Sequence, residues 1–291
     1  AQKAEAAATA AREADRNHKA RVNNAAVAAL MGAAALTEEQ AKAVVKAIAS
    51  GKISSITISY CPEASAMNMD HPIEIFDCEQ NSPEWDALRA GLVTASELQC
   101  IIAASSEKKG RKSYMERLAG EIITGAPAEN FTNHAMARGH LMEDEVRRNY
   151  GFMNDVEPKR IGFVRKGRVG CSPDSFIGED GVLEIKTAAP AVLIPKLDKD
   201  EFPNEHKAQC QGILWITGRE WVEIEVAPVV RVPTAPGEPW AYRVATEMRS
   251  LVKRAYREEA YIANLARETA AFISELDAMV ARHKVGQRVA A

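Results

Sequence analysis

Two acidic residues and a lysine near the middle of the chain have a spacing that suits phosphodiester chemistry. Pro173-Asp174 is followed, after nine intervening residues, by Glu184-Ile185-Lys186. Because side chains alternate between the two faces of a strand, Glu184 and Lys186 point to one side while Ile185 points into the core. The carboxylates of Asp174 and Glu184 repel each other unless a cation neutralises them, and Mg²⁺ prefers oxygen ligands. The spacing therefore predicts a metal site.

The chemistry expected of such a site is hydrolysis. A metal here would polarise a phosphodiester and lower the pKa of its bound water, while Lys186 orients the water or stabilises the developing charge. Taken alone, the same string also fits surface ion pairs on a hairpin, so both interpretations stay open on these residues. Glu179 and Asp180 fall in the turn of the hairpin and are expected to be only solvated.

The elements that must position these side chains are a β-hairpin and its neighbours. Strands are expected over 160–166, 169–177 and 182–187, and Gly178-Glu179-Asp180-Gly181 forms the turn between the last two. Ser82-Pro83-Glu84 starts a helix, with a capping serine and a proline at the first helical position. The remaining expected elements are helices ending near 91 and over 95–104, 112–124, 133–150 and 204–217, a strand over 220–230, and a long C-terminal helix from about 243.

The first 72 residues form a separate accessory region by composition, since alanine fills 20 of the first 50 positions. Thr37-Glu38-Glu39-Gln40 reads as a capping box that starts a helix, and Gly51 ends it. A strand is expected over 53–58. The role of this α-rich appendage stays open between partner recruitment, a small oligomerisation element and a flexible tail. Residues 73–291 are expected to form the main domain.

Composition excludes several classes of protein. The chain has 291 residues, 46% of them hydrophobic, and no apolar run long enough to cross a bilayer, so we expect a folded protein without a membrane partner. No secretory signal is recognisable, and a cytoplasmic location is expected, in a bacterial or phage-infected cell. The five cysteines form no CxxC pair, which argues against an iron–sulfur cluster. A net charge of −3 neither supports nor excludes DNA binding.

Four blocks together carry a family resemblance. They are Ser82-Pro83-Glu84-Trp85 running into Arg89-Ala90-Gly91-Leu92-Val93-Thr94-Ala95-Ser96-Glu97; Arg138-Gly139 with Glu143; Cys171-Ser172-Pro173-Asp174 with Glu184-Ile185-Lys186; and Ala208-Gln209-Cys210-Gln211 before Trp215. With these blocks the sequence resembles the lambda exonuclease and YqaJ-like viral recombinase family of PD-(D/E)xK nucleases. The resemblance covers about residues 74–225 and implies an α/β (α+β), restriction-endonuclease-like core with a central mixed sheet flanked by helices.

The resemblance also implies the roles of the acidic residues in a two-metal site for Mg²⁺, with Mn²⁺ as a substitute. Asp174 would bridge the metals, Glu184 and the Ile185 carbonyl would bind one, and Glu143 would reach the second. Lys186 would be the catalytic lysine. Glu143 could instead be a surface acid paired with Arg147 one turn on. The last metal-ligand candidate is His134, for which a plain surface role stays open.

The family grips the 5′-phosphate of the strand that it cuts, and four positions here match that grip. They are Arg89, Ser96, Ser172 and Gln209. An arginine fork suits phosphate geometry, and hydroxyl and amide donors add to it without more charge. Ser96 could instead only cap a helix, and Gln209 could only satisfy a buried backbone group. Between two expected helices, Lys108, Lys109, Arg111 and Lys112 are either a phosphate-contacting loop or a solvated one.

The resemblance implies a Mg²⁺-dependent 5′-to-3′ exonuclease that acts on double-stranded DNA ends and releases mononucleotides. The 3′ single strand that it leaves would pass to a single-strand annealing recombinase in phage-type homologous recombination. Family members form a ring-shaped homotrimer around DNA. Two alternatives stay open: an endonuclease or 3′-end nuclease of the same fold, and a DNA-end-binding adaptor in which residues 1–72 recruit a partner.

Overall fold

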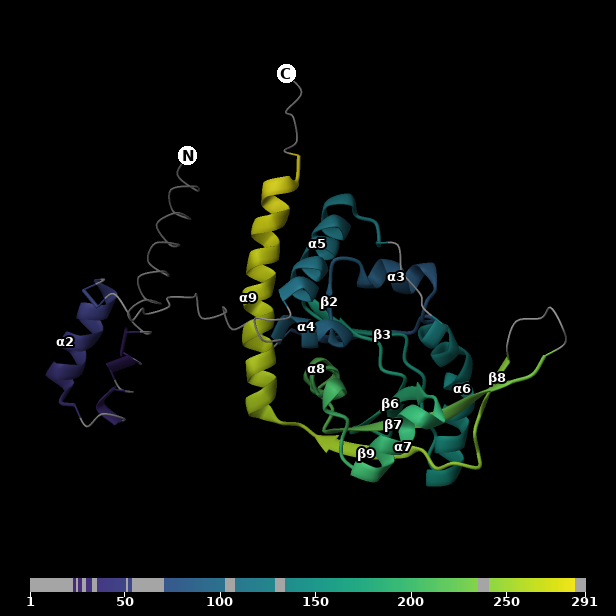
Figure 1. The fold of residues 1–291 in the computed structure, drawn as a ribbon. Coiled ribbons are helices and arrows are strands. Elements are labelled where there is room, and N and C mark those ends of the chain that lie inside the picture. Colours follow the sequence, from purple (N-terminus) through teal and green to yellow (C-terminus); the bar gives the residue numbers. More distant parts are fainter. Residues whose placement is uncertain are drawn as a thin grey trace, which may run out of the picture. The chain divides into compact units, whose positions relative to one another are not determined.

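The chain divides into two compact units, Ala1–Met69 and Asp70–Ala291. The computed structural model describes residues 23–24, 26–27, 30–32, 36–50, 52–53, 71–102, 108–128, 134–234 and 241–285 (Figure 1). The strand expected over 53–58 falls, from Ser54 onward, outside these residues. No helix within the described ranges is long and apolar enough to cross a membrane.

The helix expected after Thr37 in the N-terminal unit is confirmed. It is α2, Glu38–Ala49, and both hydrogen bonds of the predicted capping box are present between Thr37 and Gln40. One face of α2 buries Ala41 and Val45, which pack with Val27. The apolar stripe of this short helix is therefore covered within its own unit.

The second unit contains two mixed sheets. The first has the strand order β1-β3-β4-β2, in which β2 runs parallel to β4 and the other pairs are antiparallel. Its strands are β1 Ile73–Phe76, β2 Val93–Thr94, β3 Phe163–Lys166 and β4 Val169–Cys171. The sequence predicted neither β1 nor β2, because strands this short carry little periodic signal.

The second sheet has the order β5-β6-β7-β8, and β9 also pairs with β7. β6 and β7 run parallel, and the remaining pairs are antiparallel. The strands are β5 Ser175–Ile177, β6 Gly181–Ala188, β7 Trp221–Val232, β8 Ala241–Val244 and β9 Leu251–Tyr256. The expected class, mixed β structure flanked by helices, is confirmed, with two sheets in place of a single central one.

The strand predicted over 169–177 is wrong as a single element. β4 ends at Cys171 and β5 begins at Ser175 in the other sheet. Pro173 lacks the backbone N–H that a continuous ladder needs, so the chain leaves the first sheet there. Asp174 therefore lies in the crossing between the sheets, immediately before β5.

Helices cover both faces of the second sheet. On one face, Val146 and Tyr150 of α6 pack on Leu183 and Ile185 of β6. On the other face, Leu193 of α7 packs with residues of β7 and β9. The helical elements of this unit are α3 Pro83–Arg89, η1 Ala95–Glu97, α4 Leu98–Ile102, α5 Lys108–Thr124, α6 His134–Asn154, α7 Pro190–Lys199, η3 Asn204–His206, α8 Lys207–Thr217 and α9 Glu259–His283.

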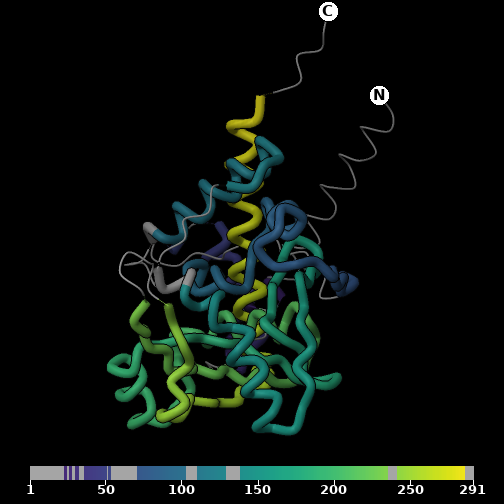
Figure 2. Tube along the Cα trace, turned by 90° about the vertical axis from the view of Figure 1, so that its right-hand side faces the viewer, coloured from purple at the N-terminus to yellow at the C-terminus, as the bar shows by residue number. Residues whose placement is uncertain are grey.

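The C-terminal helix starts later than predicted. It begins at Glu259, and the stretch from residue 243 to that point contains the end of β8 and all of β9. Leu251 and Ala255 were expected on the helix, but they share one face of β9. Residues four apart share a face both in a helix and in a strand. The spacing of this pair therefore does not distinguish the helical period of 3.6 residues from the strand period of two. α9 itself runs alongside α5 and contacts α4 and α8 (Figure 2).

Candidate active site

β6 presents its side chains as the alternation of a strand requires. Glu184 and Lys186 line a cavity of about 560 Å³, and the Glu184 side chain is only 3% exposed. Ile185 points the other way, into the core beneath α6. Pairing with β5 on one side and β7 on the other fixes the strand. The predicted alternation is therefore confirmed, and the core fixes the direction of both polar side chains.

Asp174 lines the same cavity from the crossing between the sheets. Its Oδ2 accepts a hydrogen bond of 2.5 Å from the backbone N–H of Ile185, which joins the crossing to β6. Burial, with the negative charges of Glu184 and Glu143, raises the pKa of Asp174 well above its usual value. Ionised Asp174 consequently needs more positive charge than the protein supplies around it.

The two carboxylate oxygens of Glu184 have different surroundings. Oε1 accepts hydrogen bonds of 2.5 Å from the ammonium of Lys186 and from the side-chain amide of Gln209. Oε2 is buried and has no hydrogen-bond partner within the described part of the chain. A buried, unpartnered oxygen beside a second carboxylate is what a divalent cation with oxygen ligands would satisfy. Asp174, Glu184 and the Ile185 carbonyl therefore fit a metal ion by their chemistry.

Lys186 carries its charge at neutral pH. Burial by itself lowers the pKa of this lysine, but the carboxylates of Glu184 and Asp174 outweigh burial and raise it above the usual value. A lysine held in its charged form cannot act as a general base. Its chemical use here is to stabilise negative charge or to orient a water molecule.

The structure does not decide whether Glu143 and His134 are metal ligands. Glu143 forms an ion pair with Arg147, as the surface-pair alternative expected, yet it also lies close enough to Asp174 to raise its pKa. Within the described ranges, no three His, Cys, Asp or Glu side chains cluster as a complete metal site. His134 begins α6, and its side chain lies outside the described part of the structure. The role of Glu143 as a ligand stays a prediction.

His140 is a cavity residue that the sequence reasoning missed. It lines the cavity with Asp174 and Lys186, and its Nδ1 lies 4.0 Å from Oε2 of Glu143. The available signal was the spacing of three between His140 and Glu143, because residues three apart on a helix are neighbours. Of the histidines of this helix, the family resemblance points only to His134 as a metal-ligand candidate.

Arg147 ties α6 to the crossing that carries Asp174. Its buried guanidinium donates to the Ser175 hydroxyl at 2.8 Å and to the Asp174 backbone carbonyl at 3.2 Å. The same guanidinium pairs with Glu143 and Asp144 on its own helix. One arginine thus sets the position of two acidic residues relative to β5.

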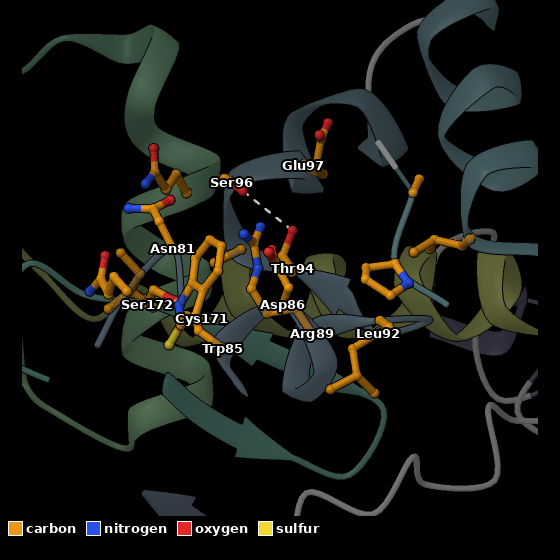
Figure 3. A pocket seen from close by; sticks show the side chains of 18 of the residues that line it. Asn81, Trp85, Asp86, Arg89, Leu92, Thr94, Ser96, Glu97, Cys171 and Ser172 are labelled. Atoms are coloured by element: carbon orange, nitrogen blue, oxygen red, sulfur yellow. Dashed lines mark hydrogen bonds between the residues drawn. The ribbon is translucent and has the colours of Figure 1, made fainter. Parts of the chain in front are cut away.

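Arg89, Trp85 and Ser172 form a second group in the same cavity, seen in Figure 3. The Arg89 guanidinium lies over the Trp85 ring, 3.8 Å from its centroid. The indole N–H of Trp85 donates to the Ser172 hydroxyl at 2.8 Å. Stacking on an aromatic ring restricts the orientation of the planar guanidinium, which leaves its N–H groups at the edge for an anion. Arg89 and Ser172, predicted together as phosphate ligands, are brought together by the fold.

Ser96 and Thr94 extend this group. Their hydroxyls lie 3.3 Å apart (Figure 3), and the backbone N–H of Thr94 donates to the Tyr114 hydroxyl at 2.9 Å. The Tyr114 ring stacks on Phe272 of α9, with 5.5 Å between centroids. The exposed Ser96 is therefore supported through Thr94 by Tyr114 of α5, which in turn packs on α9.

Gln209 lines the cavity together with the other predicted phosphate ligands, and its role as one of them stays a prediction. It lines the cavity from α8, but its amide donates to Glu184. The sequence offered no means to see this, because the direction of a side chain on α8 depends on how the helix packs between the sheets. Gln209 is therefore a direct neighbour of the metal-ligand candidate Glu184.

The basic run Lys108 to Lys112 is not a loop between two helices, as predicted, but the first turns of α5. Its glycine does not break the helix, since Gly costs only about 1 kcal/mol there. Arg111 makes a two-pronged ion pair with Glu275 of α9, at 2.7 and 2.8 Å. Lys112 lies 3.6 Å from Glu116. The side chains of Lys108 and Lys109 are outside the described part, and DNA contact by this run stays a prediction.

The cavity is therefore lined both by the candidate phosphate ligands around Arg89 and by the carboxylates and charged lysine around Glu184. Residues 84–220 match the model of the YqaJ-like viral recombinase domain. The resemblance predicted from the sequence is confirmed. This matched domain contains every acidic, lysine and phosphate-ligand candidate discussed above, whereas α9 and the N-terminal unit lie outside it.

Solved structures similar to this chain include exonucleases. The alkaline exonuclease LHK-Exo from Laribacter hongkongensis has a TM-score of 0.58 and 26% identity, over 69% of this chain and 95% of that chain. LHK-Exo in complex with dAMP gives a TM-score of 0.57 and 27% identity over the same shares. A phage related exonuclease from Haemophilus somnus shares the fold, with a TM-score of 0.51 and 15% identity, over 68% and 98%. No curated protein matches the sequence significantly.

Proposed function

We propose that this protein is a Mg²⁺-dependent exonuclease that degrades the 5′-ended strand of double-stranded DNA and releases mononucleotides. The observation that carries the proposal is one cavity that holds both the Arg89–Ser172 group and the Asp174–Glu184–Lys186 group. An anion site next to a hydrolytic site suits an enzyme that holds a terminal phosphate and cuts close to it. The match to the recombinase domain and the similarity to an alkaline exonuclease support a nuclease.

A complex of a similar enzyme supports mononucleotides as the class of product. LHK-Exo has been solved with dAMP, a nucleoside monophosphate. A nuclease that removes terminal nucleotides one at a time releases this class of compound. We propose the same product class for this chain, and a 3′ single strand as the other product. A single-strand annealing recombinase would then receive that strand, and a ring-shaped homotrimer would keep the enzyme on DNA.

The protein's own residues divide the work of the reaction. Asp174, Glu184 and the Ile185 carbonyl would hold Mg²⁺, or Mn²⁺ in its place, and Glu143 would approach a second ion. When bound, the metal supplies charge to the phosphodiester and lowers the pKa of a bound water. Lys186 stabilises negative charge, and Gln209 holds the Glu184 carboxylate in place. Arg89 and Ser172 bind the terminal phosphate and so set which bond lies over the carboxylates.

A strand-specific degradation assay tests the proposal. Linear duplex DNA with one labelled strand and a 5′-phosphate or 5′-hydroxyl end is incubated with the protein and Mg²⁺ or EDTA. We expect Mg²⁺-dependent loss of the 5′-phosphorylated strand, abolished by Asp174→Asn. Asp180→Asn, in the exposed turn of the same hairpin, is the matched control and keeps full activity.

Two outcomes would replace the proposal with its alternatives. Cutting of a covalently closed circle in the presence of Mg²⁺ would favour an endonuclease of the same fold. Tight end binding without cleavage, equal in wild type and Asp174→Asn, would favour an end-binding adaptor. Removal of residues 1–72 should leave cleavage intact if the N-terminal unit only recruits a partner.

A further inference from the structure

A second cavity, of about 440 Å³, lies at the carboxyl end of β6 and outside the candidate active site. Its lining comes from α6, the start of α7, and the paired strands β7 and β8 (Figure 1). The lining residues are Arg138, Ala189, Pro190, Val229, Val230, Arg231 and Tyr242. Arg231 and Tyr242 lie beyond the part of the chain that matches the recombinase domain.

The charge of this cavity is one-sided. Both charged side chains among the described lining residues are arginines, Arg138 and Arg231. The first turn of α7 adds to them, because no side chain caps its N-terminus at Ala189. The helix dipole makes such an end attractive to anions, although Pro190 has no N–H and the Val192 N–H already donates to the Ala189 carbonyl. Three sources of positive potential from separate elements therefore converge on one hollow.

Arg138 makes one hydrogen bond that anchors its guanidinium, and one of its buried N–H groups is left to bind a ligand. Its Nη2 donates weakly to the backbone carbonyl of Thr187, at 3.4 Å. Its Nε is buried and has no hydrogen-bond partner within the described part of the structure. A buried donor without a partner is rare in folded proteins, and a ligand oxygen would satisfy it. Arg138 is thus an anchored guanidinium with bonding capacity left over.

Arg231 and Tyr242 line the cavity from two neighbouring strands, β7 and β8. They are direct partners in the antiparallel ladder between β7 and β8. Side chains of directly paired residues project from the same face of a sheet. A guanidinium and a phenol hydroxyl placed together offer charged and neutral donors to one group of oxygen atoms.

The cavity lies next to the reaction centre along β6. Thr187, which accepts the hydrogen bond from Arg138, directly follows Lys186. Lys186 faces the first cavity, while the Thr187 carbonyl and Ala189 lead to the second. A polymer that passes over Lys186 and continues past the end of β6 would meet the two arginines.

We propose that this second cavity binds a backbone phosphate of the DNA substrate, on the side of the scissile bond away from the Arg89 group. The inference rests on the proposed function and gives the β7–β8 hairpin a part in holding DNA. An arginine fork recognises phosphate oxygens without reading the base, so the contact is independent of sequence. Ion pairing with phosphates also makes the contact sensitive to salt.

Binding of duplex DNA, measured without cleavage, tests the inference. Fluorescence anisotropy with a labelled 5′-phosphorylated duplex is followed over a salt series, with Asp174→Asn as the background. Adding Arg231→Gln should weaken binding about three- to tenfold and reduce the salt slope by about one. Arg243→Gln is the matched control, because Arg243 lies on β8 outside the lining of the cavity and forms an ion pair with Glu247 at 2.6 and 2.9 Å. Tyr242→Phe should weaken binding less than Arg231→Gln.

The outcomes separate this inference from the proposed function. Equal affinity and salt slope in Arg231→Gln and Arg243→Gln would overturn the inference, whether or not the wild type cuts DNA. Binding that depends on Arg231, in a protein that never cuts, would reject the nuclease and keep the cavity as a DNA contact. If Arg231→Gln weakened the binding of a free mononucleotide more than the binding of duplex DNA, the cavity would be a site for the reaction product. That result would overturn the proposed contact with a backbone phosphate.

Discussion

The side-chain amide of Gln209 donates to Oε1 of Glu184 at 2.5 Å, so a residue of α8 fixes the orientation of a carboxylate on β6. With Lys186 on the same oxygen, this bond leaves Oε2 as the oxygen without a hydrogen-bond partner among the residues that the structure describes. Partners behind a metal ligand set its geometry and affinity. Gln209 therefore acts on the metal site through Glu184.

Substitution of Gln209 by leucine should raise the Mg²⁺ concentration needed for half-maximal activity, by about tenfold. The affinity for 5′-phosphorylated DNA should stay unchanged. A Mg²⁺ titration of the initial rate, together with a binding assay in EDTA, measures both quantities. If Gln209 were instead a phosphate ligand, as the family resemblance implies, DNA affinity would fall and the Mg²⁺ requirement would not move.

Substitution of Arg89 by glutamine should remove the preference for a 5′-phosphate over a 5′-hydroxyl end. The loss of a charge-assisted hydrogen bond corresponds to about a tenfold or greater drop in kcat/KM on the phosphorylated end. Cleavage rates on the two ends, measured side by side, give the ratio. Arg168→Gln is the control, since Arg168 pairs with Asp277 away from the cavity. An unchanged ratio in Arg89→Gln would place the terminal phosphate elsewhere.

Substitution of Arg147 by methionine should destabilise the protein. The buried guanidinium satisfies Glu143, the Ser175 hydroxyl and the Asp174 carbonyl, and its loss leaves them without that partner. Breaking such a buried pair costs about 3 kcal/mol of unfolding free energy. Urea denaturation measures the change. Arg148→Met, at an exposed neighbouring position of α6, should stay within about 0.5 kcal/mol of wild type, and equal losses in the two variants would contradict the prediction.

His206 should make the protein less stable in mild acid. Burial, followed by the nearby charge of Lys186, lowers the pKa of His206 to about 4 from its usual 6.5. The unfolded chain binds this proton more tightly, so stability is complete above pH 6.5 and falls as the pH drops toward 4. Melting temperatures across that range should fall less in His206→Gln than in wild type. His283→Gln, at the exposed end of α9, should follow wild type.

Local chemistry made parts of the fold predictable. Thr37 and Gln40 form the expected capping box, and the serine and proline before α3 start that helix as predicted. The alternation of Glu184, Ile185 and Lys186 is a property of any strand, so the pattern alone placed two polar side chains on one side.

Other parts depend on packing that no local pattern records. Pro173 was visible, but the transfer of the chain to a second sheet at that point required the whole topology. α7 begins at Pro190 and contains Pro195, a residue that argues against a helix, yet Leu193 is fully buried and holds it on the sheet. The directions of Gln209 and His140 likewise follow from how α8 and α6 pack.

The stack of Phe272 on Tyr114 sets an order of assembly during protein synthesis. Tyr114 holds Thr94, beside Ser96, but its own support comes from Phe272 of α9, which is translated well after α5 and the β5–β6 strands. A nascent chain thus contains Asp174, Glu184 and Lys186 before the wall behind its end-binding group exists. We therefore expect the growing polypeptide to lack a rigid end-binding pocket until α9 has emerged and packed against α5.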